Sequence, residues 1–79
     1  MNDNFIQLND LPIGNSGKVK ALTAEGLMRR RMLDLGIIND TIIESLQLSP
    51  SGDPIAYLIR GAVIALRSEV ASMILVEKI

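Results

Sequence analysis

The residues best suited to chemistry in this sequence are three consecutive arginines, Arg29, Arg30 and Arg31, and the nearby Leu33. On a helix each residue is turned by about 100° from the last, so the three guanidinium groups diverge and do not form one basic patch. Leu33 projects away from the apolar side of such a helix and lies beside Arg29. An apolar residue among arginines is typical of a small protein interface. We therefore predict a docking surface for an acidic partner on this helix, with the following turn as its border: Arg29, Arg30, Leu33, Asn39 and Asp40.

Structural roles are the alternative for these side chains. Arg31 lies at the margin of the apolar stripe and would lay its aliphatic stem over the fold. Arg30 would form a weak ion pair with Asp34, four residues further along the helix. Leu33 would be buried if loops clamped the helix on two sides.

The groups most often used for nucleophilic catalysis or for iron binding are missing from the sequence. The chain has neither histidine nor cysteine, so the usual nucleophile–base pairs and thiolate metal sites are unavailable. Ferrous sites usually combine histidine with carboxylates, and the carboxylates here lack a recognisable ligand spacing. Met28, Met32 and Met73 are predicted to fill the core. We therefore expect no enzyme activity, no metal site and no cofactor.

Composition excludes further classes of protein. The net charge is −1 and the only aromatic residues are Phe5 and Tyr57, which argues against nucleic-acid binding because that needs a basic surplus and stacking rings. A proline-rich peptide groove needs more aromatic residues for the same reason. The longest uncharged apolar runs, such as Ala62 to Leu66, are only strand-sized, whereas a membrane helix needs about 20 apolar residues. With no disulfides and no secretory signal, we expect a single cytoplasmic domain over residues 1–79 that does not insert into the membrane.

The elements that would position these residues are mostly strands. One amphipathic helix is predicted over residues 24–35, capped by Thr23 and ended at Gly36. Its buried face is expected to carry Ala24, Met28, Met32 and Leu35. About five short strands are predicted, and a sheet of this size is expected to curl into a partly closed barrel. They cover residues 18–23, 41–48, 55–60, 62–66 and 73–78.

Shorter segments connect these elements. Residues 1–4 are expected to be frayed. Leu8 and Leu11 are predicted to attach a single helical turn to the core. Residues 49–54 have the Pro, Gly, Ser and Asp content of a hairpin loop, and residues 68–72 suit a brief helical turn.

Three stretches taken together resemble the FeoA family, whose members accompany the FeoB ferrous-iron permease. They are Leu8-x-x-Leu11-Pro12-x-Gly14, then Arg30 to Gly36, and finally Ser51 to Ile55 with Arg60-Gly61-x-x-Ile64-Ala65-Leu66-Arg67. Their order and spacing make the match specific. One departure is the pair Asn39-Asp40, where the family usually has Pro-Gly before its second strand.

The resemblance implies a mainly β, SH3-like barrel of about five strands with one main helix after the first strand. It also implies a non-enzymatic accessory protein of ferrous iron transport. Its partner would be a FeoB-type permease with a GTP-hydrolysing cytoplasmic domain, which would recruit the chain to the inner face of the membrane. One of the arginines could then act as a finger that stabilises charge during GTP hydrolysis.

Two alternatives differ in the partner. The same domain type also occurs in metal-dependent repressors, so the chain could be a regulatory module acting on a transcriptional partner. Self-assembly would place a homo-oligomer interface on exposed strand edges, although a homo-oligomer is not the expected state.

Overall fold

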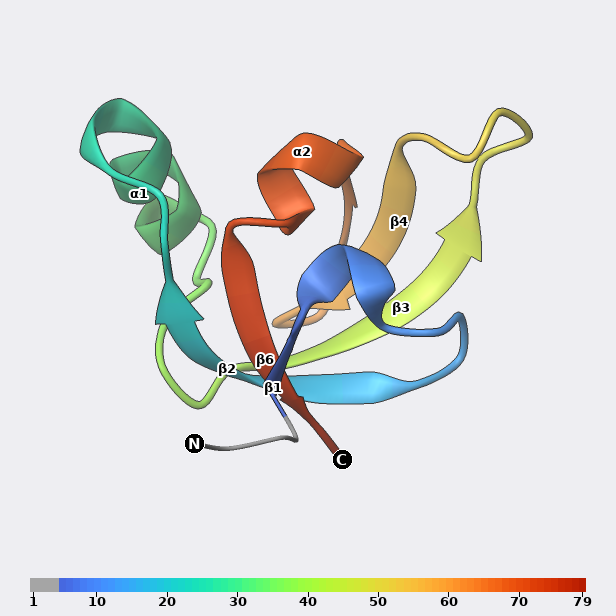
Figure 1. The fold of residues 1–79 in the computed structure, drawn as a ribbon, viewed down its shortest axis with the longest axis horizontal. Helices are drawn as coiled ribbons and strands as arrows, with labels where there is room; N and C mark the ends of the chain where they lie inside the picture. The colour runs from blue at the N-terminus through green and yellow to red at the C-terminus, as the bar shows by residue number, and fades with distance from the viewer. Residues whose placement is uncertain (1–4) are drawn as a thin grey trace.

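The computed structural model describes residues 5–79, so the predicted fraying of residues 1–4 lies outside the described residues. Figure 1 shows a strongly curved antiparallel sheet with the strand order β1-β6-β2-β3-β4-β5. The strands are β1 (Phe5–Gln7), β2 (Ser16–Leu22), β3 (Ile42–Leu48), β4 (Ile55–Ile59), β5 (Ala62–Leu66) and β6 (Ile74–Lys78). The helical segments are η1 (Leu8–Asp10), α1 (Gly26–Asp34) and α2 (Ser68–Ala71). The mainly β, barrel-like fold with one main helix is thereby confirmed.

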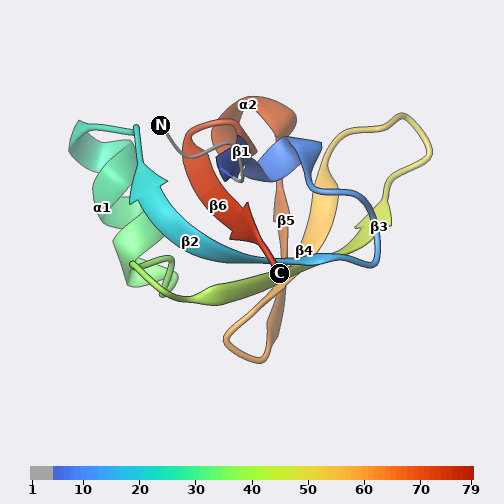
Figure 2. The same ribbon diagram turned by 60° about the horizontal axis from the view of Figure 1, so that its bottom comes forward.

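The core lies on the concave side of this sheet. Alternate residues of a strand point to the same face, so every second residue of a strand faces this core. In β4, for example, Ile55, Tyr57 and Ile59 are buried, while the two residues between them are half-buried. Figure 2 shows how η1 and α2 cover the end of the curved sheet. Buried side chains from all parts of the chain meet there, including Leu8, Val19, Met32, Ile37, Ile43, Tyr57, Ala71, Ile74 and Val76.

The structure contains six strands among the described residues, one more than predicted. The additional strand is β1, which pairs antiparallel with β6 through Ile6 opposite Val76. Three residues are too few to show an alternating pattern, so this strand could be recognised only from its pairing. The main helix consequently follows the second strand and not the first.

The helix α1 is shorter than predicted, because it begins at Gly26 and not at residue 24. The predicted Thr23 cap is wrong: the Thr23 hydroxyl donates at 3.3 Å to the carbonyl of Met73, the residue immediately before β6. The expected apolar stripe is only partly buried, since Met32 is 2% exposed but Leu35 is 36% exposed. The predicted end at Gly36 is confirmed by its left-handed conformation, with φ of 87°.

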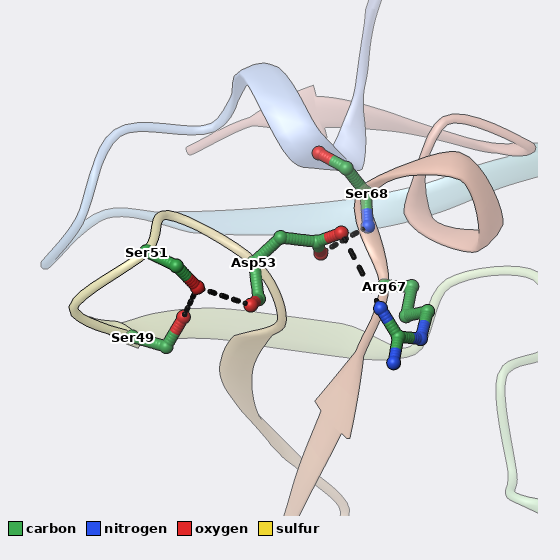
Figure 3. Close-up of polar contacts among 5 residues, drawn as sticks. All are labelled: Ser49, Ser51, Asp53, Arg67 and Ser68. Carbon is green, nitrogen blue, oxygen red and sulfur yellow. Dashed lines mark hydrogen bonds and ion pairs between the residues drawn. The ribbon is translucent and has the colours of Figure 1, made fainter.

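The loop between β3 and β4 is fastened to α2, as Figure 3 shows. The carboxylate of Asp53 accepts the main-chain N–H of Ser68 at 2.8 Å and lies 3.9 Å from the guanidinium of Arg67. Within the loop, the Ser51 hydroxyl donates to the main-chain carbonyl of Asp53 at 2.9 Å and lies 3.4 Å from the hydroxyl of Ser49. The predicted hairpin loop and the predicted turn at residues 68–72 are thus both present and attached to each other.

Candidate partner-binding surface

The end of α1 is held in a fixed position relative to the barrel. Gly36 ends the helix with its N–H donating to Leu33, and the next N–H, that of Ile37, donates to Met32 at 3.0 Å. The fully buried side chain of Ile37 packs in the core. Thr41 completes the turn, because its hydroxyl donates to the Gly36 carbonyl at 2.9 Å. The exposed residues of α1 therefore have a rigid base.

The turn that follows is hydrogen-bonded to β2. The N–H of Asp40 donates to the carbonyl of Val19, and the N–H of Val19 donates to the carbonyl of Thr41, both at 2.8 Å. Asp40 has a φ of 74°, in the left-handed region that Asn and Asp tolerate better than most residues. The Asn39 amide, oriented so that its nitrogen faces the strand, donates to the carbonyls of Val19 and Lys20. Asn39 and Asp40 thus form a turn that is hydrogen-bonded to β2.

Between α1, this turn and β2 lies a small hollow of about 140 Å³, which we call the α1–β2 hollow. Its walls combine apolar and basic side chains. Leu33 contributes from the helix and is 42% exposed, and Ile38 contributes from the turn and is 45% exposed. The lining residues are Val19, Lys20, Ala21, Leu22, Arg29, Leu33, Ile38 and Asn39.

The basic groups around the hollow are differently constrained. Arg29 donates from Nη1 to the main-chain carbonyl of Leu22 at 3.2 Å, so its guanidinium is fastened at the mouth of the hollow with other donors still available. Lys20 lies between two carboxylates, 3.5 Å from Asp40 and 3.6 Å from Glu77. Lys20 is therefore already neutralised by its neighbours, whereas Arg29 retains an uncompensated charge among the described residues.

The structure brings only some of the predicted site residues together. Arg29, Leu33 and Asn39 line one hollow, and Asp40 joins its border through the ion pair with Lys20. Arg30 is exposed but does not line the hollow. Its alternative role is absent as well, since no ion pair joins Arg30 to Asp34 in the described part of the chain.

Several residues of the hollow were not expected from the sequence, namely Val19, Lys20, Ala21, Leu22 and Ile38. Four of them belong to β2, which lies beside α1 only because the turn at Asn39 and Asp40 pairs with that strand. Their apolar and basic types carry no signal of their own. Ile38 alone offered a hint, as an apolar residue in a turn.

The side chain of Tyr57 is fully buried in the core. Its hydroxyl donates to the main-chain carbonyl of Leu8 at 3.4 Å. Burial, reinforced by the negative charges of Asp10 and Asp53, raises the pKa of Tyr57 to about 12.

Over residues 5–79 there is no cluster of three or more acidic side chains that could hold a metal ion. No helix within this range is long and apolar enough to cross a membrane.

Comparison with known proteins places these features in a family. The family model described as "FeoA domain" matches residues 6–78. A curated relative, the Fe(2+) transport protein A/Fe(2+) transporter FeoB fusion protein of Porphyromonas gingivalis, is 31% identical over 74 residues. That match covers 94% of this chain but only 9% of the relative, so the chain spans a small part of the fusion protein.

Solved structures share the fold. A FeoA-like protein from Clostridium acetobutylicum is 38% identical, with a TM-score of 0.89, covering 100% of this chain and 91% of the other. A manganese-dependent transcriptional repressor is 25% identical with a TM-score of 0.87, covering 100% of this chain and 44% of the repressor. The barrel is the SH3-like fold of FeoA proteins. Because the family model spans nearly all of the described residues, this chain belongs to the FeoA family.

Proposed function

We propose that this chain is a non-enzymatic accessory protein of ferrous iron uptake that binds the cytoplasmic part of a FeoB-type transporter and supports its activity. The observation that carries the proposal is the Porphyromonas gingivalis relative, in which a segment similar to this chain and a FeoB transporter are fused in one polypeptide. Fusion keeps two modules at a high effective concentration, which is useful only if they act on each other.

The contact surface that we propose is the part of α1 that carries Arg29, Arg30 and Leu33, together with the α1–β2 hollow. Leu33 offers an apolar side chain to bury, and Arg29 offers a positioned positive charge beside it. The fixed turn at Asn39 and Asp40 would form the border, and Arg30 would extend the basic surface along the exposed helix. A partner that fits would present an apolar side chain next to a carboxylate.

The effect on transport would follow from preferential binding. If the chain binds one conformation of the transporter more tightly than another, it favours that conformation by the difference in binding free energy. A tenfold preference shifts the equilibrium by about 1.4 kcal/mol. No chemistry by the accessory protein is then required, and an arginine finger is unnecessary.

Calorimetric titration against the isolated cytoplasmic domain of the transporter, with and without a GTP analogue, tests this proposal. We expect saturable binding that weakens in Leu33→Ala and in Arg30→Glu. The matched control is Leu27→Ala, since Leu27 is on the same helix and 85% exposed but lies outside the hollow. Equal affinities for all these variants would refute the surface. Absence of binding to this domain and also to the full-length transporter would refute the partner.

A second candidate rests on the likeness to the manganese-dependent repressor, which contains this fold as part of a longer chain. In that case the chain would act on a metal-dependent transcriptional partner. It predicts affinity for a repressor where the first proposal predicts affinity for the transporter. The same calorimetric titration, with a purified metal-dependent repressor in place of the transporter domain, distinguishes the two.

A further inference from the structure

The strand β5 forms one edge of the sheet and differs from an ordinary edge strand. Over residues 5–79, it pairs only with β4, and no other main-chain hydrogen bond reaches Ala62–Leu66. Edge strands are normally protected by charges, proline or a bulge. The sequence of β5 contains no charge and no proline, and its register with β4 is continuous. Ala62, Val63 and Ala65 are exposed, and Val63 is 67% exposed.

A second hollow lies on the outer face beside this edge, and we call it the β5 hollow. It has a volume of about 340 Å³ and is lined by Gln47, Leu48, Ser49, Pro50, Pro54, Ala56 and Ala65. Ala56 and Ala65 are directly opposite each other in the sheet, so two methyl groups form its floor where larger side chains would fill it. Its far wall is the β3–β4 loop, which Asp53 fastens to α2 (Figure 3). The hollow is therefore held open by a rigid wall.

The edge and the hollow suit one mode of binding. A strand added beside β5 would satisfy its free main-chain groups, and the residue opposite Ala65 would have its Cβ about 4.5–5.5 Å away. Its side chain would lie on the same face as Ala65 and could extend across it into the hollow. Main-chain pairing supplies affinity in such complexes, and the pocket for a side chain supplies specificity.

The charges near β5 distinguish between two strands that could pair with this edge, one from a second copy of this chain and one from another protein. Arg60 lies two residues before β5, and Arg67 immediately follows it. If a second copy paired its β5 antiparallel about Ile64, Arg67 of one chain would lie opposite Gly61 of the other, next to Arg60. Two arginines would thus gather at each end of the paired strands without being directly opposite, and their mutual repulsion disfavours this pairing. Asp53 offsets little of this charge, because its 3.9 Å ion pair with Arg67 is largely exposed.

We propose that β5 and its hollow bind an extended segment of a protein partner as an additional strand, with a large apolar residue opposite Ala65 and acidic residues at both ends. The surface is separate from that on α1: β3 and β4 lie between β2 and β5, and Figures 1 and 2 show α1 and the β3–β4 loop at opposite ends of the molecule. The proposal therefore holds whether or not α1 contacts a transporter.

The test is an NMR titration of the isotope-labelled full chain with a capped synthetic peptide, Glu-Glu-Val-Thr-Leu-Thr-Val-Glu-Glu. We expect saturable shifts and slowed amide exchange at residues 62–66. Substituting Ala65→Phe fills the hollow from an exposed position and is expected to weaken binding about tenfold. Leu33→Ala is the control, because it alters only the α1 surface and should leave peptide affinity unchanged.

Two further peptides separate the causes. Replacing every Glu by Lys should weaken binding, and methylating alternate main-chain nitrogens on the pairing edge should abolish it. The proposal is overturned if either peptide binds as well as the parent, if the shifts map to α1, or if none is seen up to ~1 mM peptide. Concentration-dependent shifts at residues 62–66 without peptide would show a second copy at this edge and would likewise overturn it.

Discussion

The side chain of Arg60 lies directly over Gly36, where it fills the space that a Cβ on that glycine would need. This contact joins the turn after β4 to the end of α1, and both residues have a positive φ, 50° for Arg60 and 87° for Gly36. The helix end is consequently defined by contact with the sheet as well as by its own backbone.

Gly36→Ala is therefore expected to destabilise the fold by more than strain alone. A left-handed conformation costs a residue with a Cβ about 1–2 kcal/mol, and displacement of Arg60 adds to it. The matched control is Gly61→Ala, since Gly61 has a similar φ of 83° but nothing within 4 Å of the added Cβ. Urea unfolding would measure both. Equal losses, or no partial rescue of Gly36→Ala by Arg60→Ala, would contradict the contact.

The link between Asp53 and Ser68 predicts a loss of stability when its acceptor is removed. Asp53→Ala should lower the free energy of unfolding by about 0.5–2 kcal/mol, as for a lost helix cap. Asp53→Asn keeps an oxygen acceptor and loses mainly the exposed pair with Arg67, so it should stay close to the parent. Thermal unfolding of the two variants checks this, and a loss of equal size in both would assign the effect to charge.

The raised pKa of Tyr57 predicts a loss of stability at high pH. An unfolded tyrosine releases its proton near pH 10, whereas in the folded chain the pKa is about 12. The contribution of the neutral phenol is complete below pH 10 and is lost as the pH rises from 10 to 12, by about 2–3 kcal/mol in total. Denaturant unfolding across this range should show the decline. A Tyr57→Phe variant should lack this component, and an identical slope in that variant would disprove it.

The position of Arg29 predicts a salt-dependent contact with the partner. Arg29→Gln should weaken binding of the transporter's cytoplasmic domain and should flatten its dependence on ionic strength, because an exposed charge pair is screened by salt. Stability should change by less than about 0.5 kcal/mol, as for most surface substitutions. Calorimetry at low and high salt measures this, with Lys18→Gln at a half-buried position of β2 as the charge-matched control. Equal salt slopes for the two variants would rule out Arg29 as the contact.

Sequence patterns were sufficient for the elements that are long and regular. The alternation in β4 and the helical spacing of Met28 and Met32 reflect burial directly, so the existence of one strand and one helix in these segments was predicted correctly. Sequence patterns were not sufficient where pairing between distant residues decides the structure. β1 exists because Ile6 pairs with Val76, and α1 starts late because the Thr23 hydroxyl bonds to Met73, 50 residues away.

The candidate site shows the same division. The exposure of Leu33 followed from helical periodicity, because only one face of α1 can reach the core. Its neighbours in space could not be predicted, since Lys20 meets the helix through a turn that pairs with β2. The separate position of Arg30 relative to the hollow follows from the same geometry.

The placement of β6 between β1 and β2 bears on how the chain folds during synthesis. The two strands nearest the beginning of the described chain can share a sheet only after residues 74–78 have been inserted between them. Pairings this distant in sequence slow folding, and until β6 has been made β1 has no partner strand and β2 is paired on one side only, with β3. A chain that stops before β6 lacks the strand that joins β1 to the rest of the sheet, and is a natural substrate for chaperones and proteases.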